Sequence, residues 1–162
     1  MMMKRLRILL WIAGLSLVAG CSSRGPVFEK YHALSNSTWD RFNQLVFTIP
    51  IEAEEGDYDI SLLLRPTPDF PYDRMPVYVI LNTPSGEERM TEIKVPVREN
   101  GKFIGEEEGK PVEVKAYLWK SIRISKSGKC KLSIENIVPK IQTPGIKEIG
   151  IRVEKAKPAK AS

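Results

Sequence analysis

The feature of this sequence that most constrains its fold is a two-residue repeat of apolar side chains. Three segments show it most clearly: Tyr58, Ile60, Leu62 and Leu64; Ile93, Val95 and Val97; and Ile149, Ile151 and Val153. Successive side chains of a β-strand point to opposite faces, so such a repeat places one face of a strand on a core. We therefore expect these segments to be half-buried β-strands.

Four further segments read as strands: residues 45–51, 77–82, 112–125 and 131–137. Residues 77–81 are apolar on both faces, which predicts a central position in a sheet. Turn-forming runs at 83–86, 100–101 and 126–129 are short enough for antiparallel hairpins. After Cys21 the sequence has no convincing helical period, although residues 37–45 can form a short helical turn. We expect one all-β domain at residues 27–154, an antiparallel β-sandwich of seven or eight strands, jelly-roll or immunoglobulin-like, with a β-barrel as the alternative.

The first 20 residues have the parts of a cleaved signal peptide. A short basic segment precedes an apolar run at residues 8–18, which is shorter than the roughly 20 apolar residues of a bilayer-spanning helix. The run ends at Val18, Ala19, Gly20 and Cys21, which resemble the lipobox of bacterial lipoproteins. The alternative is an ordinary secretory signal that a cysteine happens to follow.

The lipobox resemblance implies cleavage between Gly20 and Cys21. It also implies a diacylglycerol on the Cys21 thiol and an acyl chain, typically palmitate, on the freed amine. Two or more chains anchor a protein stably, because each buried methylene contributes about 0.8 kcal/mol. Residues 21–26 would then be the tether between this lipid and the domain. We expect no cofactor besides this covalent lipid.

The signal also explains the basic surplus of the chain. Three of its 25 Lys and Arg residues lie in the signal, which leaves 22 against 20 acidic residues. Three more lysines lie in residues 155–162, a segment of low hydrophobicity that we expect to be a disordered basic tail. The domain itself is then nearly neutral, so the net charge of +5 does not indicate nucleic-acid binding.

Catalytic and metal chemistry find little support in the sequence. His32 is the single histidine, so a multi-histidine metal site is excluded, and a catalytic triad would depend on this residue. Glu106, Glu107 and Glu108 are adjacent and lack the spacing of a calcium loop, which favours a solvated turn. Cys130 alternates with Leu132 and Ile134, so we expect a buried, inert thiol, with a reactive one as the alternative. We predict a protein that is not an enzyme and holds no metal.

One segment indicates binding to a partner. Within residues 112–125 one predicted face pairs aromatic with charged side chains: Glu113, Lys115, Tyr117, Trp119, Ser121 and Arg123. Tyrosine, tryptophan and arginine are favoured at interface anchors, so this strip suits a protein partner or a glycan. The alternative is that a loop, or the segment around Trp39 and Phe42, covers it. The segment is longer than a usual strand, and we expect a bend or bulge near Lys120.

Ordered landmarks along the chain resemble the gliding-motility lipoproteins of the GldH family. They are residues 58–65, Phe70 to Tyr72, Gly101 to Gly105 and residues 145–154. Phe103 stands where tryptophan is commoner, and a Met-Arg pair is missing after Ile134, which marks a divergent member. The resemblance implies a non-catalytic envelope lipoprotein of the Bacteroidota, associated with gliding or the linked type IX secretion machinery and anchored in the outer membrane.

The landmarks also have direct physical interpretations. Arg65 precedes Pro66 at a strand end, where we expect it to pair with a carboxylate, with partner recognition as the alternative. Phe70 and Tyr72 are expected to cap one end of the core. The candidate partner-binding residues are therefore Arg65, Phe70, Tyr72, Lys115, Tyr117, Trp119 and Arg123. Residues 22–26 contain no acidic residue, which favours the periplasmic face of the membrane. We also expect protein partners in the cell envelope.

Overall fold

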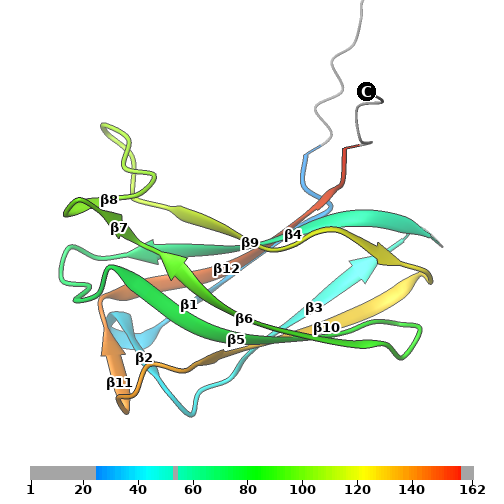
Figure 1. Ribbon diagram of the computed structural model, residues 1–162, viewed down its shortest axis with the longest axis horizontal. Coiled ribbons are helices and arrows are strands. Elements are labelled where there is room, and N and C mark those ends of the chain that lie inside the picture. Colours follow the sequence, from blue (N-terminus) through cyan, green and yellow to red (C-terminus); the bar gives the residue numbers. More distant parts are fainter. Residues whose placement is uncertain (1–24, 53–54, 158–162) are drawn as a thin grey trace, which may run out of the picture.

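Two sheets of four antiparallel strands pack face to face in the computed structural model, which describes residues 25–52 and 55–157 (Figure 1). The first sheet has the order β1 (Phe28–Ala33), β12 (Ile146–Lys155), β4 (Gly56–Pro66) and β9 (Val114–Ile124). The second has the order β3 (Leu45–Ile51), β10 (Gly128–Asn136), β5 (Arg74–Asn82) and β6 (Glu88–Pro96). The predicted antiparallel sandwich is confirmed.

Short elements complete the ends of the sandwich. A single 3-10 turn, η1 (Ser35–Ser37), leads into β2 (Thr38–Asp40), which pairs with β11 (Gln142–Pro144). At the other short pair, β7 (Arg98–Glu99) lies against β8 (Lys102–Phe103). No helix in the described ranges is long and apolar enough to cross a membrane.

The core lies between the inner faces of the two sheets. In the pairing of β4 with β12, Leu62 lies opposite Ile151 and Leu64 opposite Ile149, and all four are fully buried. Each such side chain contributes about 1.5–3 kcal/mol on leaving water. The two-residue repeat seen in the sequence is therefore the repeat of core contacts.

The predicted strand positions agree closely with the structure. β3 has the predicted bounds, and β5 lies between β10 and β6, so its predicted central position is confirmed. Cys130 shares the buried face with Leu132 and Ile134, as expected.

The predicted helical turn at residues 37–45 is wrong. Thr38–Asp40 is strand, and Leu45 already begins β3. Trp39 decides the local structure, because its side chain is fully buried and its Nε1 donates to the Asn43 carbonyl at 2.8 Å. Tertiary burial therefore overrides the weak local preference of this polar segment.

The predicted irregularity of β9 is confirmed. Ile122 lies opposite Tyr58, Trp119 opposite Ile60, and Tyr117 opposite Ser61, so β9 has one residue more than β4 in each step. Ser121 has a φ of 50°, as expected where a strand bulges. The bulges shift the alternation, and Trp119 packs against the core instead of facing outward with Tyr117.

The chain enters and leaves the domain at neighbouring points, where the start of β1 and the end of β12 lie side by side (Figure 1). There the Val27 N–H donates to the Val153 carbonyl at 2.7 Å. β12 extends to Lys155, one residue beyond the predicted domain limit. The predicted signal peptide, the lipid site at Cys21, residues 21–24 of the tether and residues 158–162 of the tail lie outside the described residues.

Candidate functional site

The outer face of the first sheet carries a cluster of polar and charged side chains from β1, β4 and β12 and from the residue that directly precedes β9. We call it the charged face, formed by Glu29, Tyr31, Arg65, Glu113, Glu148 and Arg152. Antiparallel register brings these residues together, because Glu29 lies opposite Arg152 and Glu148 lies opposite Arg65. Each strand contributes outward-pointing positions between its buried ones.

Arg65 is the centre of this cluster. Its Nη1 donates to Glu148 at 2.7 Å and its Nε donates to Glu113 at 2.9 Å. Its guanidinium also lies 4.0 Å from the centre of the Tyr31 ring. The hydrogen bond to Glu148, followed by that to Glu113, raises the pKa of Arg65. The predicted pairing of Arg65 with a carboxylate is confirmed, while its role toward a partner remains a prediction.

Tyr31 closes the cluster over the sheet. Its hydroxyl lies 2.9 Å from Glu113 and 3.2 Å from Glu29, and its pKa is raised by burial and by Glu113. A Cβ at Gly150 would come within 2.6 Å of the Tyr31 ring, so only glycine lets the ring lie against this strand. The outward-facing Leu63 of β4, directly across from Gly150, is fully buried.

The carboxylates of the charged face are engaged with arginines. Arg152 pairs with Glu29 and lies 3.7 Å from Glu113, and the hydrogen bond from Arg152 lowers the pKa of Glu29. Partly exposed pairs each contribute about 0.2–1 kcal/mol, so their main effect here is to fix side-chain positions. The charged face is therefore a preorganised surface.

Next to the charged face lies a smaller group that we call the Tyr117 cluster, made of Lys115, Tyr117 and Lys120. Tyr117 is 43% exposed, and the two ammonium groups lie 5.0 and 4.4 Å from the centre of its ring. Lys115 also donates to Glu154 at 2.8 Å. Of the predicted binding residues, Arg65, Lys115 and Tyr117 are thus brought to one face, while Arg123 lies further along β9, paired with Glu55 and Asp57.

The other predicted binding residues lie elsewhere. Phe70 is 1% exposed and packs edge-on against the partly buried Tyr72, with ring centres 5.8 Å apart, so this pair caps the core as expected. Trp119 packs against the core. Trp39 is buried in β2, which pairs with β11, and Tyr117 keeps its exposure; the segment around Trp39 and Phe42 therefore does not cover Tyr117.

His32, Glu107 and Cys130, which were weighed for catalysis or metal binding, each have contacts or burial that the structure defines. His32 has its Nε2 3.0 Å from the Val46 carbonyl and its ring edge-on to Phe47, with centres 4.6 Å apart. Glu107 pairs with Lys110 in an exposed loop. Burial raises the pKa of the Cys130 thiol to about 11. Among residues 25–52 and 55–157, no three His, Cys, Asp or Glu side chains gather as metal ligands would.

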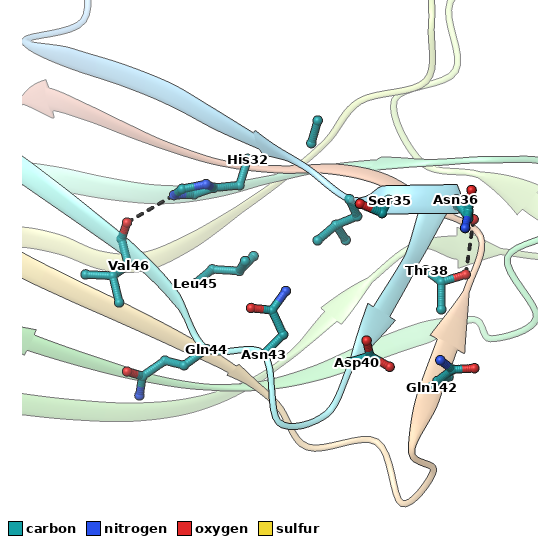
Figure 2. Close-up of a pocket in the computed structure, with 12 residues that line it drawn as sticks. His32, Ser35, Asn36, Thr38, Asp40, Asn43, Gln44, Leu45, Val46 and Gln142 are labelled. Carbon is teal, nitrogen blue, oxygen red and sulfur yellow. Dashed lines mark hydrogen bonds between the residues drawn. The ribbon is translucent and has the colours of Figure 1, made fainter.

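A polar cleft of about 510 Å³ lies at the end of the sandwich near β2 and β11 (Figure 2). Residues from β1, η1, β2, β3, β11 and the loop between β2 and β3 line it. Sequence reasoning missed this cleft and most of the charged face, because both are assembled from distant segments. The one local signal for the cleft was the density of Ser, Asn and Gln in residues 35–44.

Comparison with known proteins identifies one family. The family model described as GldH lipoprotein matches residues 26–153, which is nearly the whole of the domain. The search of curated proteins finds no match.

Proposed function

Because the chain belongs to the GldH lipoprotein family, we propose that it is a lipid-anchored, non-catalytic interaction subunit of the cell envelope. In this proposal it serves gliding motility or the linked type IX secretion machinery, and it acts by holding protein partners. The family membership agrees with the resemblance of the sequence landmarks.

The observation that carries the proposal is the charged face with the adjoining Tyr117 cluster. Arg65 and Arg152 hold three carboxylates and Tyr31 in fixed positions, so little side-chain freedom is lost when a partner binds. Tyr117 stays 43% exposed between two lysines. An exposed tyrosine with cations around it suits an acidic surface of a partner protein.

Two further observations support a role without catalysis. The glutamates of the charged face are each ion-paired with a guanidinium group, which occupies their carboxylates in structural contacts. His32 has its Nε2 against a backbone carbonyl of β3 and its ring against Phe47. The glutamates and His32 thus make structural contacts, which is consistent with a subunit that acts by binding partners.

The anchor in this proposal is lipid on Cys21, and the domain lies on the periplasmic face of the outer membrane. The described chain starts four residues after Cys21, at the edge of the first sheet, so the domain would stay close to the bilayer. Protease treatment of intact cells tests this placement. Protection of the domain is expected, and its removal by the protease would contradict the periplasmic placement.

A genetic experiment tests the function itself. Deletion of the gene is expected to impair gliding or type IX secretion, and wild type is expected to restore it. A variant with Lys115→Glu and Lys120→Glu should fail to restore it, because both cations beside Tyr117 are reversed. Lys131→Glu is the matched control, since this exposed lysine lies on the second sheet. Intact gliding, secretion and envelope integrity in the deletion strain would refute the proposal.

The alternative of a glycan held between Tyr117 and Trp119 has no specific support. Trp119 packs against the core, and the Tyr117 ring has two ammonium groups near it. Tyr117 and Trp119 therefore do not form a pair of exposed rings for a sugar.

A further inference from the structure

The polar cleft near β2 and β11 is separate from the charged face and has features of a binding site of its own. Neighbouring strands place Asp40 and Gln142 opposite each other, and the loop after β2 contributes Asn43 (Figure 2). Ser35 and Asn36 of η1 form another wall, and the buried Leu34 and Leu45 also line the cleft. The cleft is thus polar at its walls, with apolar side chains behind them.

The walls offer hydrogen-bonding groups that are still free. The side chains of Asn36, Asp40, Asn43 and Gln142 make no hydrogen bond to another described residue, and all four are exposed. Asparagine and glutamine amides each present donors and an acceptor, and the carboxylate is a further acceptor. The twelve lining residues include no lysine or arginine. This chemistry matches an uncharged ligand rich in hydroxyl groups and disfavours an anionic one.

Buried hydrogen bonds of Trp39 and Asn136 fix the segments that line the cleft. Trp39 is fully buried, and its bond to the Asn43 carbonyl fixes the loop that carries Asn43. The Asn136 amide donates to the Trp39 carbonyl at 3.2 Å and to Thr143 at 2.9 Å, which ties β2 to β11. Preorganised polar groups lose less entropy when they bind a ligand.

Two features of the segments around the cleft add to this assignment. Asn36 and Ser37 both have left-handed backbone conformations, with φ of 53° and 49°, and such strain gathers at binding sites. Phe42 is 85% exposed in the loop that carries Asn43, and Ile141, which directly precedes Gln142, is 71% exposed. Phe42 does not line the cleft itself, but an exposed phenyl ring in the same loop suits the apolar face of a sugar ring that extends beyond the cleft.

We propose that this cleft binds an uncharged glycan, through Asp40, Asn43 and Gln142. This goes beyond the proposed function, because it assigns a second site with a different kind of ligand. The cleft lies at the end of β1 away from Val27, where the chain enters the sheet.

The test uses the full-length lipidated protein in detergent micelles. Chitotetraose and maltotetraose are the probes, and a heparin-derived tetrasaccharide is the anionic control. Saturation-transfer NMR detects binding, and titration gives the dissociation constant. We expect at least one neutral tetrasaccharide to bind and the heparin fragment to bind at least about tenfold more weakly.

Variants locate the site. Asn43→Ala and Gln142→Ala are each expected to weaken binding at least about tenfold. Asn82→Ala is the matched control, because Asn82 carries the same amide, ends β5 and is not one of the twelve residues that line the cleft. Its affinity should stay within about twofold of wild type, with all variants unfolding at the wild-type midpoint.

Four results would overturn the assignment. The first is no saturation transfer from either neutral tetrasaccharide at millimolar concentration. The second is binding that survives both Asn43→Ala and Gln142→Ala, which would place the sugar elsewhere. The third is a preference for the heparin fragment. An extended peptide captured in the cleft in place of sugar would likewise refute it. None of these outcomes bears on the proposed partner-binding role of the Tyr117 cluster, which Lys115→Glu and Lys120→Glu test separately.

Discussion

Substitution of Gly145 by alanine tests the packing of the turn between β11 and β12 against the loop that follows β4. Gly145 has a φ of 83°, and a Cβ there would lie 2.5 Å from the backbone nitrogen of Phe70. The Gly145 carbonyl also accepts a hydrogen bond from Thr67 at 2.8 Å, which holds the two segments together. The new methyl group therefore meets backbone that cannot rotate away, and one segment must move.

The magnitude has two parts. A left-handed conformation costs an alanine about 1 kcal/mol, and forcing a methyl group into packed structure costs about 1–3 kcal/mol more. We therefore expect Gly145→Ala to lower the free energy of unfolding by about 3 kcal/mol. Gly86→Ala is the matched control, because Gly86 has a φ of 88° with nothing within 4 Å of its Cβ position. It should cost about 1 kcal/mol.

Urea unfolding of the full-length protein, followed by tryptophan fluorescence, measures both variants. Trp39 and Trp119 contact the core and report on its loss. The reasoning predicts that Gly145→Ala is more destabilising than Gly86→Ala by about 2 kcal/mol. Equal losses in the two variants would refute the close approach of Gly145 to Phe70.

Three further predictions concern buried and paired groups. The Asn136 side chain is 1% exposed and makes hydrogen bonds to Trp39, Thr143 and Val138. Asn136→Ala should therefore lower the free energy of unfolding, measured in urea, by about 3 kcal/mol. A loss near zero would contradict this structural role. Burial raises the pKa of Cys130 to about 11, so iodoacetamide at about pH 8 should label it only in denaturant, and mass spectrometry of the folded protein should show no adduct. The hydrogen bond from Arg152 lowers the pKa of Glu29 below its ordinary value of 4.5, so the stabilisation from this pair is present above pH 4.5 and is lost as the pH falls through the folded-state pKa. The stability difference between wild type and Arg152→Gln should therefore shrink on acidification, and a constant difference would argue against the pairing.

The parts of the fold that were predictable from sequence are those with one buried face. β3, β4, β5, β6, β10 and β12 all contain regular apolar positions, and each was expected near its observed place. β1 was missed because its inner face has the polar Lys30 and His32 after Phe28, which leaves no two-residue repeat of apolar side chains. β2 and β11 were missed because three-residue strands leave no periodic pattern.

The candidate site was predictable only in part, for physical reasons. Arg65 was expected to find a carboxylate, yet its partners Glu113 and Glu148 lie 48 and 83 positions away in the sequence. Strand register decides such pairs, and register depends on the assembled sheet. Trp119 was assigned to the wrong face because the two bulges of β9 shift its alternation, and their places depend on the pairing with β4.

Affinity capture of the lipidated protein from its own membranes tests the central proposal most directly. Wild type and the Lys131→Glu control should retain the same envelope proteins, including components of the gliding or type IX secretion apparatus. The variant with Lys115→Glu and Lys120→Glu should lose them while keeping its fold and its membrane association. Equal recovery of these proteins by all three forms, or capture of none by wild type, would contradict a partner-binding role for the Tyr117 cluster.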